Sequence, residues 1–226
     1  MYAEYKIRFP PFYDVPGRLA VQWPSWAEAG GTGRSLWRAE NLERGMRLFH
    51  FSDDPSIDVF SPRPVRVPSP RLPGMEWLNG PLVWAIDEWH QPLYLFPREC
   101  PRILIWLGPR TSPKDRSLWW GHRSCRMLGH LEEAWWDRMT AAVLYRYELP
   151  TEAFDPLNDA GMFVSRSPVE PLAVRAIESL PAELAACEVE LRIMPSLSPL
   201  REVWNSTMQV SGIRLRNARE WTEATL

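Results

Sequence analysis

A histidine and a hydroxyl side chain share one face of the first strand that the sequence predicts. His50 and Ser52 lie two residues apart in the segment 48–52, and the side chains of a strand alternate between its two faces. Phe49 and Phe51 then belong to the opposite face. A histidine among aromatic side chains at the end of a strand can hydrogen-bond a hydroxyl of a ligand. The sequence leaves one alternative open, a core histidine whose ring nitrogens bind backbone groups.

Two tyrosines in a later predicted strand belong to the same hypothesis. Tyr145 and Tyr147 lie on one face of the segment 143–149, which ends before a proline. If this strand adjoins the first, both phenol rings lie alongside His50 and Ser52. A phenol can stack on a ring-bearing ligand or hydrogen-bond to it. We therefore expect these four side chains to line one pocket.

Arginine supplies nearly all the positive charge, and two arginines lie close together in the segment 97–102. The chain has 26 lysine and arginine residues, of which two are lysine. A planar guanidinium binds phosphate oxygens in pairs, so Arg98 and Arg102 are candidates for holding a pyrophosphate. Cys100 offers a second interpretation, a thiol whose pKa the two arginines would lower. The alternative for this cysteine is burial as a small apolar side chain.

Signatures of several common site classes are missing from the sequence. It contains no phosphate-binding loop, no dinucleotide-binding glycine motif and no nucleophile elbow. His122, Cys125 and His130 come nearest to a metal-ligand spacing, but zinc sites usually have tighter pairs of ligands. We therefore expect no metal.

Composition sets further limits. The chain has 226 residues, a formal net charge of −2 and 45% hydrophobic residues, enough for one or two domains with a sizeable core. The lack of basic excess disfavours a nucleic-acid coat without excluding a nucleic-acid partner. No apolar run is long enough to span a membrane, so no membrane partner is expected. An odd number of cysteines and the lack of a secretory signal predict a cytoplasmic protein. The sequence does not address its oligomeric state.

Short predicted strands alternate irregularly with helices. Strand patterns, in addition to the first, cover 81–86, 102–107, 143–149, 162–164, 172–174 and 189–193. Helical patterns cover 126–142 and 179–187, and a third helix is expected to begin at Ser198. This arrangement favours an α+β fold, a single domain with a bent or split, mostly antiparallel sheet and about three helices.

The chain is expected to divide into three parts. Residues 1–45 are rich in proline and glycine and lack a sustained period, which indicates a poorly ordered extension or a start codon placed too early, with Met46 as the alternative start. Residues 46–218 form the α+β domain, and 219–226 form a tail.

Several segments together resemble a small bacterial family of uncharacterised proteins that is known as a domain of unknown function. The segments are 48–52, 77–87, 97–102, 145–150 and 211–218. The resemblance runs from about Met46 to about Ala218 and implies no established activity.

A more distant resemblance is to the ADP-ribosyltransferase fold. It rests on Phe49-His50-Phe51-Ser52 and on the later segment 164–171, which includes Ser165. The resemblance implies that NAD is bound, with His50 at the nicotinamide ribose. Transferases of this fold usually carry a catalytic glutamate at the start of a late strand, where this chain has Gly161-Met162-Phe163. Asp159 and Glu170 are the nearest carboxylates and therefore the catalytic candidates.

Two functional hypotheses follow. The first is a nucleotide-binding, ADP-ribosyltransferase-like protein that transfers from NAD to an unknown acceptor, using a carboxylate to stabilise the charge that develops as the nicotinamide–ribose bond breaks. The alternative is a non-catalytic binding or structural module with an unknown partner.

Overall fold

The structure, a computed structural model, describes residues 45–68, 71, 73–157 and 159–221. The expected extension 1–45 lies outside the described residues except for its last residue. The expected tail 219–226 is described as far as Trp221. Among the described residues, no helix combines the length and apolar character that crossing a membrane requires.

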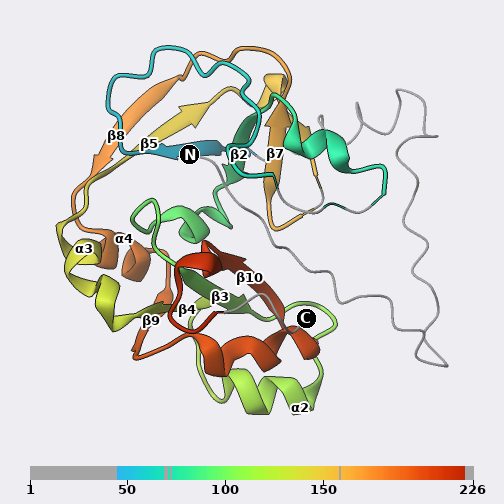
Figure 1. Cartoon of the computed structure of the whole chain (residues 1–226), viewed down its shortest axis with the longest axis vertical. Helices are drawn as coiled ribbons and strands as arrows, with labels where there is room; N and C mark the ends of the chain where they lie inside the picture. The colour runs from blue at the N-terminus through green and yellow to red at the C-terminus, as the bar shows by residue number, and fades with distance from the viewer. Residues whose placement is uncertain (1–44, 69–70, 72, 158, 222–226) are drawn as a thin grey trace.

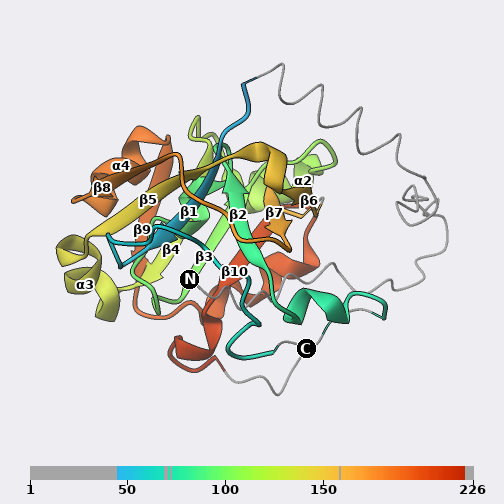
Figure 2. The same cartoon turned by 90° about the horizontal axis from the view of Figure 1, so that it is seen from above.

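Two mostly antiparallel sheets form the framework (Figure 1). The larger sheet has six strands, which are in spatial order β6 (Asp155–Pro156), β7 (Met162–Ser165), β2 (Val83–Asp87), β1 (Leu48–Ser52), β5 (Leu144–Leu149) and β8 (Ala173–Ile177). Figure 2 shows this order from above. The smaller sheet has four strands, which are in spatial order β10 (Gln209–Ile213), β3 (Arg102–Trp106), β4 (Met127–Glu132) and β9 (Val189–Met194). Of its pairs, β4 with β9 is parallel.

The helices are short, as the many prolines lead one to expect. The α-helices of the described chain are α2 (Pro113–Asp115), α3 (Trp136–Ala141) and α4 (Leu180–Ala186), and α2 continues into a π-helical turn at Arg116–Trp120. The 3-10 helices lie at Glu76–Asn79, Gln91–Tyr94, Glu133–Trp135, Thr151–Ala153, Ser198–Asn205 and Leu215–Asn217. The expected α+β class with a split, mostly antiparallel sheet is confirmed.

One predicted helix is wrong. The segment 126–142 has apolar residues at helical spacing, yet its first half is the strand β4 and only its second half, from Glu133, is helical. All six residues of β4 are buried, because β3 and β9 flank it in the smaller sheet. β4 has the sequence Met-Leu-Gly-His-Leu-Glu, which is neither a continuous apolar run nor a strict alternation, so the apolar residues at helical spacing suggested a helix instead.

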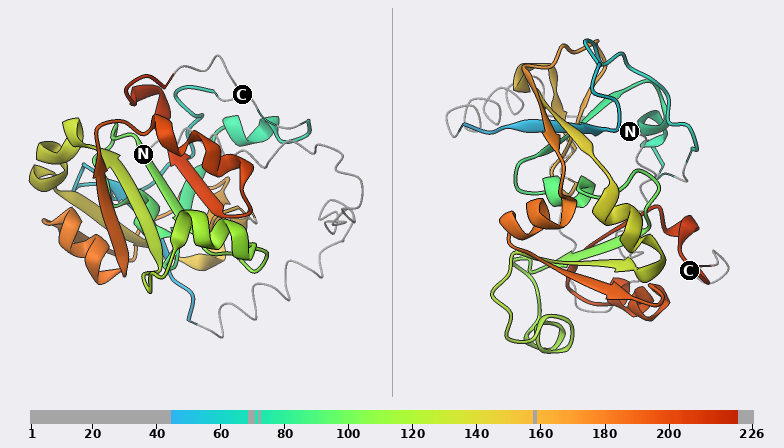
Figure 3. Two further views of the ribbon diagram at one scale, coloured as in Figure 1. Left: turned by 90° about the horizontal axis from the view of Figure 1, so that it is seen from below. Right: turned by 90° about the vertical axis from the view of Figure 1, so that its left-hand side faces the viewer.

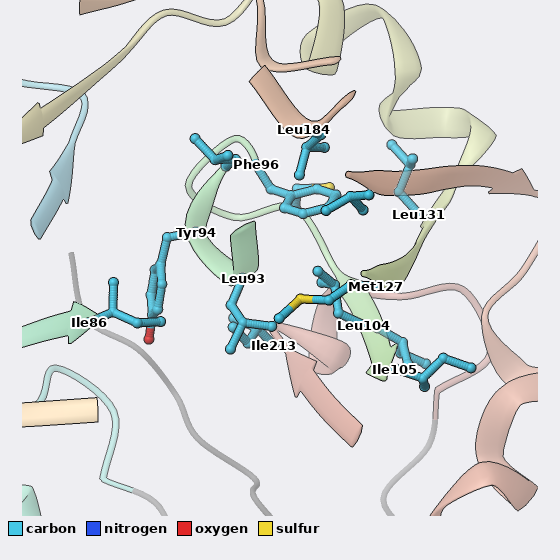
Figure 4. Packing of buried hydrophobic residues seen from close by; sticks show 14 of the residues in the cluster. Ile86, Leu93, Tyr94, Phe96, Leu104, Ile105, Met127, Leu131, Leu184 and Ile213 are labelled. Atoms are coloured by element: carbon cyan, nitrogen blue, oxygen red, sulfur yellow. The ribbon is translucent and has the colours of Figure 1, made fainter. Parts of the chain in front are cut away.

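The main core lies between the two sheets. The segment that contains the helix Gln91–Tyr94 runs between them, as the side view in Figure 3 shows. Tyr94 lies beside Ile86 of the larger sheet, while Leu93 and Phe96 approach side chains of the smaller sheet (Figure 4). This one short segment therefore joins both sheets into one apolar cluster.

A second, smaller cluster covers the outer face of the larger sheet. It contains Leu48 of β1 and Tyr147 of β5, and Phe60 from the loop after β1 packs on them. The backbone of Phe60 is tied to Val169 by hydrogen bonds in both directions, of 2.8 and 3.0 Å. The loop therefore forms a fixed cover over the face that carries His50.

Candidate active site

An aspartate and a histidine form a hydrogen-bonded pair just after β2. Nδ1 of His90 lies 2.9 Å from Oδ1 and 3.0 Å from Oδ2 of Asp87. The backbone N–H of His90 also donates to Oδ1, at 2.7 Å. The side chains are 20% (His90) and 22% (Asp87) exposed, so both reach solvent. A turn that follows directly after Asp87 thus returns the imidazole to the carboxylate that ends the strand.

A strained turn before β7 lies against this pair. The backbone N–H of Met162 donates to the carbonyl of Asp159 at 2.8 Å, and the two residues between them have positive φ, 41° at Ala160 and 70° at Gly161. A positive φ is unusual for alanine. A Cβ atom at Gly161 would lie 2.2 Å from Nδ1 of His90 and 2.5 Å from Oδ2 of Asp87. Only glycine therefore allows the backbone to approach the pair this closely.

The turn begins with a partly buried carboxyl, Asp159. Burial raises the pKa of Asp159 to about 6, and the positive charge of Arg71 opposes part of this rise, as does His90 when its ring is protonated. Arg71 donates from Nε to Oδ1 of Asn79 at 3.2 Å. Its Nη2 is buried and has no hydrogen-bond partner among the described residues. A buried donor without a partner is costly, and a ligand oxygen can satisfy it.

Aromatic rings surround the imidazole of His90. The rings of Trp89 and Trp106 meet it edge to face, with centroids 4.6 and 5.6 Å away. Arg126 lies 4.7 Å above the ring of Trp89 and donates to its carbonyl oxygen. Trp106 is nearly buried, whereas Trp89 remains 42% exposed. The rings fix the imidazole in place and leave one side of the cluster open to water.

His50 lies in a different setting, in the middle of the larger sheet. Only Leu48 and Phe49 of β1 pair with β2. Beyond this pairing, Nδ1 of His50 forms a hydrogen bond with the carbonyl oxygen of Trp84 at 2.8 Å. The ring of Phe60 packs on the imidazole with centroids 4.6 Å apart. Burial lowers the pKa of His50 to about 3, so this ring stays neutral.

The two predicted tyrosines do lie opposite the expected residues. In the pairing of β1 with β5, Tyr147 faces His50 and Tyr145 faces Ser52. The hydroxyl of Tyr147 donates to the carbonyl of Asp54 at 2.7 Å and accepts the backbone N–H of Ile57 at 3.2 Å.

Ser52 also takes part in holding that loop. Its hydroxyl accepts the backbone N–H of Asp54 at 3.1 Å. Ser52 and Tyr147 therefore have structural partners, which hold the loop that covers this face.

Of the two arginines predicted to bind phosphate, one is exposed and the other is buried. Arg98 is exposed and pairs with Asp53 at 3.1 Å. Arg102 is 2% exposed, donates to the carbonyls of Leu93 at 3.0 Å and Cys100 at 3.1 Å, and its burial lowers its pKa to about 10. Burial also raises the pKa of Cys100 to about 12, which opposes a reactive thiolate.

The structure distinguishes Asp159 from Glu170, the other predicted catalytic carboxylate. Glu170 is exposed on the surface. Ser165 is buried, and its hydroxyl donates to the carbonyl of Ser167 at 3.1 Å. Of the two carboxylates that the sequence offered, Asp159 is the one whose pKa is shifted by burial and by the charge of Arg71. In the described part of the chain, no three side chains of the metal-binding types come together.

Sequence reasoning missed His90, Asp87 and Arg71. His90 is isolated from other histidines and cysteines in the sequence, so spacing gave no reason to select it. A usable signal was present in Asp87-Glu88-Trp89-His90, because an acid at the end of a predicted strand, three residues before a histidine, suits a turn that returns the ring to the carboxylate. No pattern indicates Arg71, which comes from the proline-rich segment.

Comparisons with known proteins identify a family without assigning a function. No curated protein matches the chain, and no solved structure matches it. The sequence model of a family of unknown function, DUF6886, matches residues 49–218, which include all of the strands and α-helices described above except the first residue of β1. Because the match covers well over half of the chain, the protein belongs to the DUF6886 family.

Proposed function

We propose that this protein binds a nucleotide, with NAD as the first candidate, and transfers its ADP-ribosyl group to an acceptor. The substrate class comes from the resemblance of Phe49-His50-Phe51-Ser52 and the segment 164–171 to the ADP-ribosyltransferase fold. The observation that carries the proposal is the partly buried carboxyl of Asp159, which lies just before β7 and whose pKa burial raises to about 6. A carboxyl with a perturbed pKa beside a histidine and an arginine is typical of an active site.

Asp159 is the nearer of the two candidate carboxylates to the start of β7, where the resemblance expects a catalytic glutamate and this chain has Gly161-Met162-Phe163. It precedes the first residue of β7 by three positions, and the turn with Ala160 and Gly161 fixes its backbone. Glu170, the other candidate, lies beyond β7 and is exposed. An exposed carboxylate has an ordinary environment and makes a weaker case.

Arg71 fits a ligand that carries phosphate oxygens. Its Nη2 is buried without a partner among the described residues, and the guanidinium is close enough to Asp159 to oppose the rise in its pKa. A guanidinium is the side chain best suited to phosphate. Arg71 would hold an anionic part of the ligand near the carboxyl, a role for which Arg102 is less suited because backbone carbonyls already occupy its Nε and Nη1.

The chemistry required of Asp159 is electrostatic. NAD, when bound, supplies nicotinamide as the leaving group and a ribose carbon on which positive charge develops. The ionised carboxylate of Asp159 would stabilise that charge, and the stabilisation is strong because little water competes. Since the pKa of Asp159 is about 6, the rate is expected to rise with pH between about 5 and 7.

Release of nicotinamide tests the proposal. The full chain is incubated with NAD, and nicotinamide is measured by chromatography for wild type, Asp159→Asn and Glu170→Gln. We expect Asp159→Asn to lower the rate by a factor of about 100 to 1,000. Glu170→Gln, a matched loss of one nearby carboxylate, is expected to leave the rate within about twofold of wild type, because Glu170 is exposed.

The alternative of a non-catalytic module predicts a different result. No nicotinamide would then be released by wild type or by either variant, and heat in a calorimetric titration with NAD would show whether the module nevertheless binds the nucleotide. If millimolar NAD produces no heat and no nicotinamide is released, nucleotide binding is contradicted altogether.

A further inference from the structure

We infer that His90 is a general base for a hydroxyl nucleophile, either water or an alcohol of the acceptor, and that Asp87 positions it. The inference rests on the proposed function for the identity of the group transferred. It adds what the proposed function leaves open, namely the chemical class of the acceptor and the residue that activates it. The geometry of the Asp87–His90 pair carries it.

The carboxylate fixes which ring nitrogen carries the proton. Asp87 accepts at both oxygens from Nδ1 of His90, at 2.9 and 3.0 Å. An ionised carboxylate can only accept, so Nδ1 holds the hydrogen and Nε2 of the neutral ring presents a lone pair. This is the arrangement by which a carboxylate orients a histidine that acts as a base.

Nε2 of His90 is available to a substrate. It makes no hydrogen bond to any residue that the structure describes, and the side chain is 20% exposed. The rings of Trp89 and Trp106 hold the imidazole from its sides. The ring is therefore oriented by one carboxylate and two aromatic contacts without being shut off from solvent.

The other histidines lack this combination. His50 and His130 each bond a backbone carbonyl through Nδ1, and burial lowers their pKa values to about 3 and about 4. His122 is exposed, but the described residues offer it no carboxylate contact of the kind that His90 has. Within the described chain, His90 alone joins an orienting carboxylate to an accessible second nitrogen.

The proposed step balances without any further reactant. Nε2 of His90 takes the proton of the hydroxyl as the hydroxyl oxygen forms a bond to the ribose carbon. The bond from that carbon to nicotinamide breaks, and its electron pair stays on the nicotinamide nitrogen. Asp159 stabilises the charge at the carbon, while Asp87 stabilises the imidazolium that forms at His90. The proton then passes from His90 to solvent.

Chemical modification tests His90 without any substrate. Diethyl pyrocarbonate acylates an accessible, unprotonated imidazole nitrogen, and mass spectrometry locates the product. At pH 7 we expect His90 and the exposed His122 to react, and His50 and His130 to be protected. Lack of reaction at His90 while His122 reacts would overturn the inference, since Nε2 would then be neither accessible nor basic.

The variant Asp87→Asn sharpens this test. The backbone N–H of His90 needs an acceptor at the Oδ1 position, so the asparagine oxygen stays there and its NH₂ group turns toward Nδ1. The amide would donate to Nδ1 and move the ring proton to Nε2. We expect acylation of His90 to slow severalfold while His122 reacts at the wild-type rate. An unchanged rate at His90 would contradict the positioning role of Asp87.

Transfer to methanol tests the acceptor class. With NAD and added methanol, wild type should form both ADP-ribose and its methyl riboside, because either hydroxyl can be activated. His90→Gln is expected to lower both products by a factor of about 100 or more while NAD still binds. Unchanged products in a folded His90→Gln variant would overturn the inference. If wild type forms neither product, the proposed function fails instead, and the modification pattern alone decides whether His90 is an oriented base.

Discussion

Two regions of the molecule each hold one histidine, the first region His50 and the second region His90. Both histidines bond to β2 through Nδ1, but the acceptors differ. Nδ1 of His50 meets the carbonyl of Trp84, the second residue of β2. Nδ1 of His90 meets the carboxylate of Asp87 at its end. His50 lies under the loop that carries Phe60, whereas His90 lies beside the exposed ring of Trp89.

The difference shows that the acceptor and the access of water separate a structural histidine from a reactive one. A neutral carbonyl does not stabilise an imidazolium as a carboxylate does, and burial lowers the pKa of His50 to about 3. His50 therefore contributes a hydrogen bond and packing. His90 has a partner that stabilises positive charge and a second nitrogen that solvent can reach. Sequence reasoning selected His50 and missed His90, yet only His90 combines these features.

The largest effect is expected from Gly161→Ala, which should disrupt the second region. The new Cβ would lie 2.2 Å from Nδ1 of His90, at a φ of +70° that alanine rarely adopts. We expect the free energy of unfolding, measured by urea denaturation, to fall by about 2–4 kcal/mol. Gly74→Ala is the matched control, because its φ is +82° but nothing lies within 4 Å of the new Cβ. Its expected loss is about 1 kcal/mol, from backbone strain alone. Equal losses in the two variants would show that the close approach to His90 costs nothing.

Stability as a function of pH tests the burial of Asp159. Because its pKa is raised from 3.8 to about 6, the folded state binds a proton more tightly than the unfolded state. The Asp159 contribution to stability is therefore largest below pH 4 and is lost as pH rises from about 4 to 6. Relative to wild type, Asp159→Asn should gain about 1–3 kcal/mol over this range and keep the gain at pH 7.5.

The stability of wild type alone does not isolate Asp159, because the neutral His50 and His130 change stability in the opposite direction over the same pH range. Their lowered pKa values remove stability as pH falls. Thermal melts of both proteins at pH 4, 5, 6 and 7.5 give the difference. If the difference in stability between wild type and Asp159→Asn does not change with pH, the pKa of Asp159 is not raised.

Alanine in place of each histidine compares the two regions directly. His50→Ala removes the hydrogen bond to Trp84 and the contact with Phe60, and should cost about 1–3 kcal/mol of unfolding free energy. His90→Ala should cost less than about 1 kcal/mol, because the ring is partly exposed and Asp87 can be solvated without it. The reverse order would contradict the assignment of His50 as structural and His90 as available for chemistry.

The smallest effect is expected from the tyrosine hydroxyls of the first region. Tyr147→Phe removes the bonds to Asp54 and Ile57 and should cost about 1 kcal/mol. Tyr145→Phe is the control, because its hydroxyl makes no hydrogen bond to a described residue, and it should change stability by less than about 0.5 kcal/mol. If NAD binding depends on Tyr145 and not on Tyr147, the first region takes part in binding after all.

Local pattern accounts for much of this fold. The alternation of Leu48, His50 and Ser52 with two phenylalanines predicts β1, and the alternation in 144–149 predicts β5. Prolines at 101 and 150 bound their strands, and Ser179 directly precedes α4 as predicted. Such signals suffice wherever polar and apolar residues alternate along a strand or a helix has a clear beginning, because neighbours in the chain then determine the conformation.

Long-range packing decided the conformation of β4 and the surroundings of the candidate site residues. Residues 127–132 form a strand because β3 and β9 lie on either side of them, which no period within the segment reveals. The sequence determined that Asp159 is one of two carboxylates near a late strand, but the tertiary structure placed it near His90 and Arg71 and left Glu170 in solvent. It likewise put the ring of His50 under a loop and that of His90 against Asp87. Desolvation and charge pairing depend on groups distant in the chain, so the chemistry of each histidine was decided by the fold and not by its neighbours in sequence.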